Sequence, residues 1–522
     1  MAASSAPDPY KGQEVMAEVR RLKYSVNGEW RESKTREYMP VTDSSTGQVI
    51  AEAPSCTIDE VNEAVDAARA AFADWAAKPV AVRTQVMYKW KQLIEDSVDG
   101  LALLVATELG KNLEESRGEI LKVAEATEVA CCLPMAIQGR CAMEVSRFHD
   151  TAVYREPVGV FTGIAPFNFP AMIPFGWMVP LCITTGNTMV IKAASMVPLT
   201  GQRLLDLLYE AGLPKGVVNM VTCRRKEADL LLCHPDVKGI SFVGSTAVGQ
   251  YVYAKGASGG KRVQALCEAK NHGIVLKDAP LERTALGIIN SCFGCAGMRC
   301  MALPVLLVQN ACADEFIGYL VKHAKQRVVG PAYDLKTELG PVVSAEHKKF
   351  VVDWITKAED EGAELLLDGR NVVVPGYEGG YYLGPTIFDH VTEDMSCGRE
   401  EVFGPVTFIK RFDDFDEAIG VCNASRFANG SCIYTASGYH AREFVRRTDG
   451  GMVGVNVGIP VPVSFFSFTG NKQSFFGDLH VLGTEGVDFY TRAKTVTTRW
   501  FSEEDMKAAK ITTWEGTSSK AG

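Results

Sequence analysis

The feature that most constrains the fold is a regular alternation of short apolar runs with helical patterns, which begins near Tyr154. Helical patterns such as residues 201–211 and 226–233 separate the runs. Strand–helix alternation at this spacing predicts an α/β fold built on a parallel, doubly wound sheet. The expected strands are residues 159–164, 189–192, 217–221, 239–243 and 262–267.

Small polar segments follow three of these runs, at residues 165–168, 192–195 and 244–246. Doubly wound sheets bind their ligands beyond the carboxyl ends of the strands, so these segments mark the expected ligand edge. Gly244 closes a strand and opens a helix, where backbone N–H groups can approach a phosphate. A plain strand-to-helix turn capped by Ser245 or Thr246 is an equally good interpretation of this run alone.

Outside this region the sequence predicts further helices and an edge strand. Thr57 and Glu60 match a capping box that opens an amphipathic helix, and more helix is expected over residues 82–109 and 113–135. A second α/β region is expected from about residue 270 to 475. Residues 489–500 alternate and are rich in threonine, which is typical of an edge strand ready to pair with a partner subunit.

The bulk composition excludes several classes of partner. A chain of 522 residues suffices for two or three domains, and its net charge of -9 argues against nucleic acid or anionic membrane. No apolar run is long enough to span a bilayer. Fifteen cysteines without framework spacing favour reduced thiols in an intracellular protein, and the lone Cys292-x-x-Cys295 pair favours no metal site.

Residues 287–303 form an apolar, small-residue stretch that contains Arg299 and Cys300. A thiol beside a guanidinium can be held partly as thiolate, which suits a nucleophile. The competing interpretation is a buried structural cysteine, the commoner state of a cysteine in an apolar segment. Partners elsewhere in the chain must decide between the two.

Five motifs supply such partners in order along the chain. They are Pro166-Phe167-Asn168-Phe169-Pro170, Gly186-Asn187-Thr188 with Lys192, Phe242-Val243-Gly244-Ser245, Gly297 with Cys300, and Glu401-x-Phe403-Gly404-Pro405. Together they resemble the aldehyde dehydrogenase superfamily over about residues 25–500. The stretches around Asn168, Lys270 and Cys300, and the tail from residue 474 to 491, are most similar to the CoA-acylating methylmalonate-semialdehyde dehydrogenases.

The resemblance implies a division of the chain and a set of site residues. Residues 25–138 and 158–268 would form the dinucleotide-binding domain, 269–475 the catalytic domain, and 139–157 with 486–501 a β oligomerisation arm. Cys300 would be the nucleophile, with the Asn168 side-chain amide and the Cys300 N–H binding the oxyanion. The resemblance implies that Lys192 and the Ser195 position lie at the adenosine ribose, Gly244 and Ser245 at the pyrophosphate, and Glu401 with Phe403 at the nicotinamide ribose and ring. Ala165, Phe167 and Cys267 fall at other cofactor-contact positions.

The chain departs from the superfamily pattern at the position of the general base. Hydrolytic members carry a glutamate there, whereas this chain has Leu266. Without a base to activate water, the acyl-enzyme would wait for a thiolate, and CoA supplies one. Glu268 stands two residues on, and residues 266 and 268 of a strand face the same side, so Glu268 is an alternative base.

Two further departures concern specificity. The subfamily is expected to grip a substrate carboxylate with two arginines; Arg299 matches one, but the other position is Lys122, which keeps the charge and loses the bidentate fork. Ser195 stands where a glutamate usually binds the adenosine ribose. This removes a repulsion against a 2′-phosphate, so NAD is favoured and NADP is possible.

The resemblance therefore implies NAD-dependent oxidation of malonate or methylmalonate semialdehyde, with CoA as co-substrate, to acetyl-CoA or propionyl-CoA plus CO2 and NADH. The alternatives are a hydrolytic NAD(P)-dependent enzyme using Glu268, a cysteine hydrolase or acyltransferase using His272, and a binding protein on a dehydrogenase fold. A homodimer or homotetramer is expected. The family suggests the mitochondrial matrix, with the cytoplasm as alternative, because acids in the first 22 residues weaken a presequence.

Overall fold

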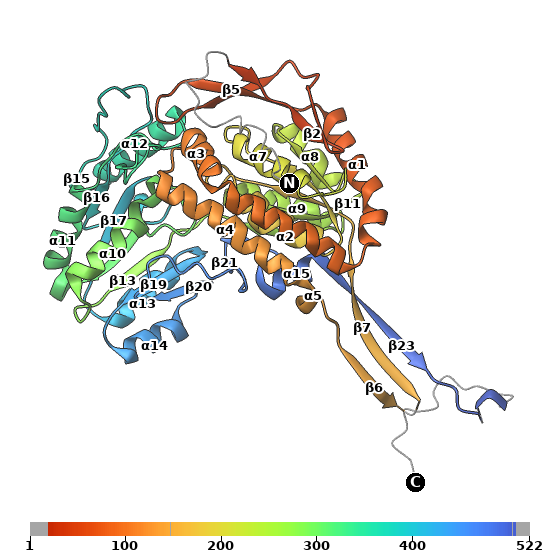
Figure 1. The fold of residues 1–522 in the computed structure, drawn as a ribbon. Coiled ribbons are helices and arrows are strands. Elements are labelled where there is room, and N and C mark those ends of the chain that lie inside the picture. Colours follow the sequence, from red (N-terminus) through yellow and green to blue (C-terminus); the bar gives the residue numbers. More distant parts are fainter. Residues whose placement is uncertain (1–18, 147, 504, 508–522) are drawn as a thin grey trace, which may run out of the picture.

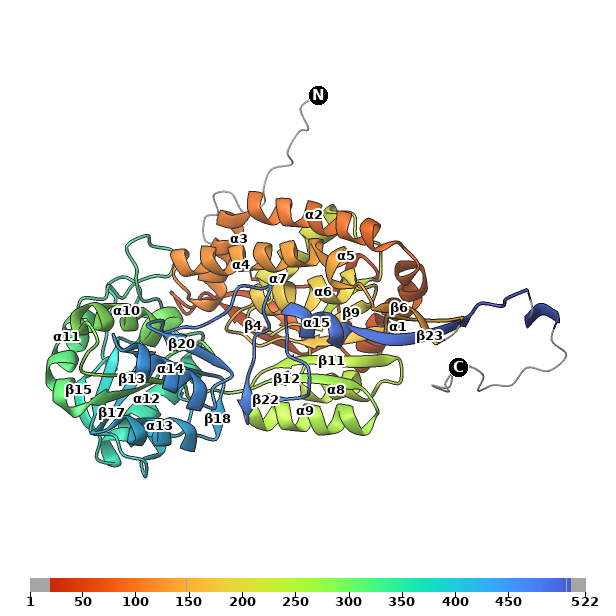
Figure 2. The ribbon, with the colours of Figure 1, turned by 90° about the horizontal axis from the view of Figure 1, so that it is seen from below.

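The computed structural model describes residues 19–146, 148–503 and 505–507, and it shows two helix-covered sheets with a long β arm (Figures 1 and 2). Residues 1–18, most of the segment that bears on the presequence, lie outside the described residues. Among the residues described, no helix is both long and apolar enough to cross a membrane.

The first sheet has eight strands in the order β22-β12-β11-β8-β9-β10-β2-β3. Its five central strands are parallel and begin and end within two residues of the predicted bounds. The chain runs from β8 outward to β10 and then crosses back to β11 on the other side of β8, so the strand order reverses there. The bounds are β8 (Val160–Ile164), β9 (Thr188–Lys192), β10 (Val218–Val221), β11 (Val237–Val243) and β12 (Arg262–Leu266), with β22 (Phe475–Phe476), β2 (Tyr24–Val26) and β3 (Glu29–Arg31) antiparallel at the edges.

Helices bury apolar cores on both faces of this sheet. The Thr57 capping box is present, since its hydroxyl accepts from Glu60 and the Glu60 carboxylate accepts from the Thr57 N–H. The helix predicted over residues 82–109 is two helices that meet at Ser97. On one face lie α2 (Val80–Asp96), α3 (Val98–Leu109), α4 (Leu113–Cys131), α5 (Leu133–Ala136), η1 (Met172–Met178), α6 (Val179–Thr184) and α7 (Leu199–Glu210); on the other lie α1 (Ile58–Ala76), α8 (Arg225–Cys233) and α9 (Thr246–Ser258).

The second sheet has seven strands in the order β15-β16-β17-β14-β13-β19-β20, all parallel except β15. Two further apolar cores lie between its faces and its helices. The strands are β13 (His272–Val275), β14 (Val305–Gln309), β15 (Glu364–Leu367), β16 (Thr386–Asp389), β17 (Val406–Phe412), β19 (Gly430–Tyr434) and β20 (Met452–Val455), and the helices are α10 (Leu281–Phe293), η2 (Gly294–Gly297), α11 (Ala313–Lys325), α12 (Ala345–Asp360), α13 (Phe415–Ala424) and α14 (Gly438–Arg447).

The β arm extends away from both sheets (Figures 1 and 2). It consists of β6 (Cys141–Ser146), β7 (His149–Pro157) and β23 (Thr491–Arg499), with β23 at one edge, as predicted. The strand starts two residues later than expected. Phe489 and Tyr490 end helix α15 (Gly483–Tyr490) instead, because their rings are buried against Phe161, with centroids 5.5 and 4.9 Å away.

The remaining elements are short, and the residue boundaries of the three domains stay a prediction. The elements are β1 (Arg20–Arg21), β4 (Tyr38–Thr42), β5 (Val49–Pro54), β18 (Phe427–Ala428), β21 (Asn471–Lys472), η3 (Asn310–Cys312), η4 (Ser396–Gly398) and η5 (Asp505–Lys507).

Candidate active site

Cys300 lies in the loop between η2 and β14, and its backbone is fixed by two amides. The Cys300 carbonyl accepts from Asn271 Nδ2 at 2.9 Å and from Asn429 Nδ2 at 3.1 Å. Gly297 lies so close to the Gly404 carbonyl that a Cβ would approach its oxygen to 2.0 Å. A glycine is therefore required for the Cys300 loop to pack against the Glu401–Pro405 motif.

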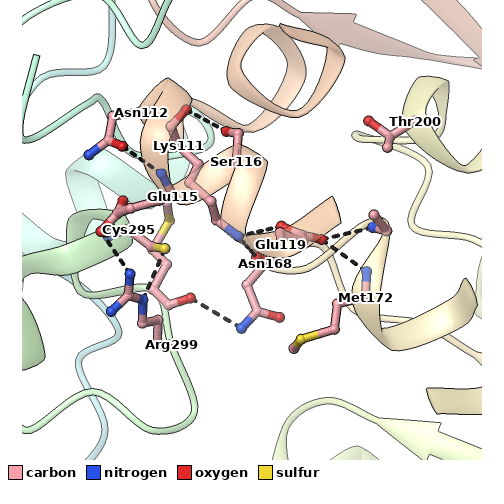
Figure 3. Close-up of polar contacts among 12 residues, drawn as sticks. Lys111, Asn112, Glu115, Ser116, Glu119, Asn168, Met172, Thr200, Cys295 and Arg299 are labelled. Atoms are coloured by element: carbon pink, nitrogen blue, oxygen red, sulfur yellow. Dashed lines mark hydrogen bonds and ion pairs between the residues drawn. The ribbon is translucent and has the colours of Figure 1, made fainter. Parts of the chain in front are cut away.

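Asn168 lies in the loop after β8 and points toward the Cys300 loop (Figure 3). Its buried side-chain amide donates to the Met298 carbonyl at 3.1 Å. An asparagine amide has two N–H donors, so one is engaged by Met298 and the second can bind an oxyanion near Cys300. The structure thus brings together the two residues to which the resemblance assigns catalysis.

An ion pair buried completely inside the protein supports the Asn168 loop (Figure 3). Lys111 pairs with Glu119, and its ammonium also donates to the Asn168 carbonyl at 3.2 Å. The Glu119 carboxylate accepts from the backbone N–H groups of Ala171 and Met172 at 2.9 and 3.0 Å. The pair therefore ties the start of α4 to Asn168 and to the chain that follows it.

The expectation that Arg299 holds Cys300 as thiolate is wrong for the free protein. Burial, and after it the Glu401 carboxylate, raises the pKa of the Cys300 thiol to about 12. The Arg299 guanidinium instead binds Glu115 at 2.7 Å and the Cys295 sulfur at 3.0 Å. The guanidinium is thus neutralised by another partner and has only a small effect on Cys300.

A cavity of about 280 Å³ contains the Cys300 side chain. Both predicted carboxylate-binding residues, Arg299 and Lys122, line this cavity. The Lys122 Nζ lies 2.5 Å from the Glu125 Oε2. The Glu125 carboxylate also accepts from the Ser464 hydroxyl and N–H. The rest of the lining is Gly118, Glu119, Glu115, Cys295 and Met301, with apolar walls of Phe169, Met172, Trp177, Ile459, Val461 and Phe468. Such a cavity suits a small molecule with an apolar body and one carboxylate.

Glu268 does not face this cavity, contrary to the argument from strand alternation. Strand β12 ends at Leu266, which packs into the core on the α4 face, while Cys267 packs into the core on the α9 face. The Glu268 carboxylate accepts from the Thr246 N–H at 2.9 Å, at the start of α9. Ser245 occupies the N-cap of α9, as the turn interpretation expects, but its side chain makes no capping hydrogen bond.

Glu401 and Phe403 belong to the motif that packs against the Cys300 loop. Glu401 is affected by burial, and Phe403 has a strained backbone. Burial raises the pKa of Glu401 to about 8, and its carboxylate accepts from the Ala269 N–H at 3.1 Å. Phe403 has a left-handed φ of 55°, and its ring packs edge-on against Phe167. Phe167 and Phe403, two of the residues expected to contact the cofactor, thus contact each other.

Two more cavities flank Lys192, at the switch point of the first sheet. One of about 330 Å³ is lined by Ala165, Gly244 and Ser245, and one of about 660 Å³ by Phe167 and Ser195. Gly249 lets α9 approach β12, because a Cβ there would lie 2.2 Å from the Cys267 sulfur. Open space, a close helix N-terminus and a lysine fit a dinucleotide. Cys267, Glu401 and Phe403 line neither cavity.

His272 is unsuited to the base role of a cysteine hydrolase. It is buried in strand β13, does not line the Cys300 cavity, and burial lowers the pKa of its imidazole to about 3. An imidazole with this pKa cannot take a thiol proton near neutral pH.

Several residues that shape the site carried no sequence signal. Lys111 and Glu119 fall near and within a predicted helix, where such residues are ordinarily solvated. Asn429 holds the Cys300 carbonyl from 129 residues away. The His347 Nε2–H donates to the Phe403 carbonyl at 2.8 Å, which holds Phe403 in place. Of the residues that shape the site in this way, only Asn271 lies in a motif that the sequence singled out, Ala269–His272.

Fold and site together define a dinucleotide-binding enzyme with a cysteine and an amide at the junction of two α/β sheets. The chain belongs to the aldehyde dehydrogenase family, whose model matches residues 30–496. The resemblance noted in the sequence is thus confirmed.

One relative and two solved structures show which members of the family are similar to this chain. The chain is 45% identical to a malonate-semialdehyde dehydrogenase of Bacillus cereus (strain G9842), over 93% of this chain and 100% of the relative. It is 37% identical to the crystal structure of a putative methylmalonate-semialdehyde dehydrogenase from Sinorhizobium meliloti 1021 complexed with NAD, with a TM-score of 0.92 over 93% and 99% of the two chains. A methylmalonate-semialdehyde dehydrogenase from Oceanimonas doudoroffii matches with 37% identity and a TM-score of 0.91, over the same shares.

Proposed function

We propose that this protein oxidises malonate or methylmalonate semialdehyde with NAD and transfers the acyl group to CoA. The observation that carries the proposal is the small cavity in which the Cys300 thiol lies among apolar walls together with Arg299 and Lys122. The names of the relatives agree with this substrate class. Arg299 and Lys122 would bind the substrate carboxylate and so direct the aldehyde toward Cys300.

The first half of the reaction forms a thioester on Cys300. The Cys300 thiol first loses its proton to solvent. The thiolate then attacks the aldehyde carbon, and the second N–H of Asn168 with the Cys300 N–H stabilises the negative charge on the aldehyde oxygen. NAD, when bound, supplies the acceptor for the hydride that leaves this carbon. Because its pKa is about 8, Glu401 is largely protonated at neutral pH. A protonated Glu401 carries no negative charge and therefore does not repel the Cys300 thiolate.

The second half requires a nucleophile other than water. The two carboxylates that line the cavity are already bound: Glu115 by Arg299, and Glu119 by Lys111 and two backbone N–H groups. Leu266 is apolar and Glu268 is directed to α9, so neither activates water beside Cys300. The CoA thiolate attacks the thioester carbon, the bond to Cys300 Sγ breaks, and the cysteine leaves as thiolate. Loss of CO2 leaves a thioester enolate that takes up a proton, so no dedicated residue is needed.

The test is NADH formation at 340 nm with methylmalonate semialdehyde and NAD, with and without CoA. We expect sustained turnover only with CoA, and none in the Cys300→Ala variant. Leu266→Glu is the matched gain-of-base variant, and we expect it to acquire turnover without CoA. Sustained CoA-independent turnover by the unaltered protein, abolished by Glu268→Gln, would contradict the proposal and establish the hydrolytic alternative.

We also propose that two or more copies associate through the arm. Strand β23 is paired with β7 along one edge only, and its other edge is free of a strand within the described residues. An open strand edge of nine residues supports pairing with a second subunit. Light scattering of the intact protein distinguishes monomer, dimer and tetramer. The compartment stays a prediction.

A further inference from the structure

The two cations that line the Cys300 cavity, Arg299 and Lys122, are each already paired with a carboxylate. The Arg299–Glu115 pair is nearly buried, since its side chains are 13% and 11% exposed. The side chains of Lys122 and Glu125 are more open, at 42% and 30%. Because each pair has no net charge, this cavity attracts a carboxylate less strongly than two uncompensated cations would.

Helix α4 supplies one wall of the cavity and also carries Glu125. Glu115, Gly118 and Lys122 line the cavity at steps of three and four residues, so they lie along one face of the helix. A Cβ at Gly118 would meet no side chain within 4 Å, which leaves open space one turn from Lys122. Glu125 follows Lys122 by three residues but does not line the cavity. It therefore holds the Lys122 ammonium from outside the space that a substrate would enter.

Glu125 is fixed in this position by a second contact. Its Oε1 accepts from the N–H and the hydroxyl of Ser464, both at 2.9 Å, and Ser464 is buried. Burial acts to raise the pKa of Glu125, but the hydrogen bonds from Lys122 and Ser464 lower it below its ordinary value, so the carboxylate is charged at neutral pH. Open ion pairs contribute little when both side chains can move, whereas this carboxylate is anchored beside Lys122.

We infer that Glu125 is a specificity-determining residue, which competes with the substrate carboxylate for Lys122. The ammonium has three N–H donors, so Lys122 can bind a ligand while it keeps Glu125, but its charge is then shared between two carboxylates. Glu125 thereby weakens the preference of the cavity for acids over neutral aldehydes of the same size. The inference rests on the proposed function for the acidic substrate and not for the transfer to CoA.

The test compares two reagents that alkylate Cys300 in the full-length protein: iodoacetate, which carries a carboxylate, and iodoacetamide, which is neutral. In both reactions the Cys300 sulfur bonds to the reagent carbon and iodide leaves. Mass spectrometry of the Cys300 peptide gives the two rates at one pH. The ratio of the iodoacetate rate to the iodoacetamide rate cancels any change in the thiol itself and reports how far the cavity favours a carboxylate. In Glu125→Gln we expect this ratio to rise about fivefold, because one negative charge near the reagent is lost.

Three further variants assign the effect to the charge of Glu125. Glu125→Asp keeps the charge and should keep the ratio within about twofold of the unaltered protein, and Lys122→Gln should lower it about fivefold. Glu128→Gln is the matched control, since Glu128 is exposed on the same helix and does not line the cavity. The exposed Cys233 gives the reference ratio for the reagents. A ratio that stays unchanged or falls in Glu125→Gln, or that rises equally in Glu128→Gln, would overturn the inference.

The alkylation needs neither NAD, CoA nor an aldehyde, so failure of the proposed reaction leaves it unaffected. Turnover provides a second measurement. Glu125→Gln should lower the KM for methylmalonate semialdehyde about fivefold and leave the KM for propanal within about twofold. An equal change in both KM values would mean that Glu125 only shapes the cavity, and this too would overturn the inference.

Discussion

Replacing Glu119 by glutamine should show how much the buried ion pair contributes. The side chains of Glu119 and Lys111 are fully buried, so Glu119→Gln leaves an ammonium inside the protein without its counter-charge. Removing one partner of a buried pair costs about 3–5 kcal/mol of unfolding free energy. Glutamine keeps an oxygen for the N–H groups of Ala171 and Met172, so the loss reports mainly on the charge.

The same substitution should reduce catalysis through Asn168, because the Lys111 ammonium donates to the Asn168 carbonyl. Losing an oxyanion donor outright costs about 10²–10³ in kcat, and a displaced donor should cost about tenfold. The assays are urea unfolding followed by tryptophan fluorescence, and CoA-dependent NADH formation. In the Lys111→Met, Glu119→Gln double variant, about 2 kcal/mol should return, because no unpaired charge remains.

The control is Glu95→Gln, which breaks the partly exposed Lys91–Glu95 pair on α2. That change should cost at most about 0.5 kcal/mol. If Glu119→Gln costs no more than Glu95→Gln, or if the double variant is less stable than the single one, the reasoning from the buried charge is refuted.

Three further predictions concern titration and cofactor binding. Cys300, with its thiol pKa raised to about 12 by burial, should be alkylated by iodoacetamide about tenfold faster per pH unit up to pH 10, measured by mass spectrometry of its peptide. Glu401 has a folded pKa of about 8 against an ordinary 4.5, so the folded state holds an extra proton between these values. The unfolding free energy should therefore fall by about 1 kcal/mol per pH unit from pH 6 to 8, and less steeply in Glu401→Gln. Glu268→Gly should free the Thr246 N–H and tighten NAD about fivefold in calorimetric titration.

Each of these has a control and an outcome that would contradict it. The exposed Cys132 serves as an internal reference for the reagent, and a Cys300 rate that levels off near pH 8 would mean that the thiol is already ionised. An unchanged slope in Glu401→Gln would place the titration elsewhere. Glu268→Gln keeps an oxygen for the Thr246 N–H and should tighten NAD less than Glu268→Gly does; weaker NAD binding in both variants would show that Glu268 supports the cofactor.

Most of the fold was predictable because its strands are short, buried and regularly spaced. The five central strands of the first sheet follow from apolar runs between helices, as does the strand-to-helix turn at Gly244. The break between α2 and α3 at Ser97 could not be predicted, since the residues around it fit one continuous helix. The end of α15 was missed for another reason: Phe489 and Tyr490 suit a strand locally, and only their packing on Phe161 decides otherwise.

The candidate site was predictable in its residues and less so in its electrostatics. Cys300, Arg299 and Lys122 line one cavity, and Asn168 is hydrogen-bonded to the loop that carries Cys300, while the roles of these residues stay a prediction. The charge state of Cys300 was not predictable from its neighbour in sequence, because Arg299 is directed to Glu115 and burial dominates the thiol. Sequence adjacency gives no direction for a side chain.

The direction of Glu268 was missed for the same reason. The alternation rule holds inside a strand, but β12 ends at Leu266, so residue 268 belongs to a loop whose course the sequence does not specify. The helix N-terminus at Thr246 then attracts the carboxylate. Helix termini that attract charge across the chain become visible only when the elements are packed together.

The pairing of β7 with β23 can form only when synthesis of the chain is nearly finished. Thr151 and Thr497 face each other in the arm although 346 residues separate them. At about 5–20 residues per second on the ribosome, β7 waits roughly 17–70 s for its neighbour. The edge of β12 likewise stays open until β22 emerges. The nascent chain therefore carries one uncovered strand edge from β7 onward and two between β12 and β22, and any chaperone that shields these edges must remain bound until the last strand is made.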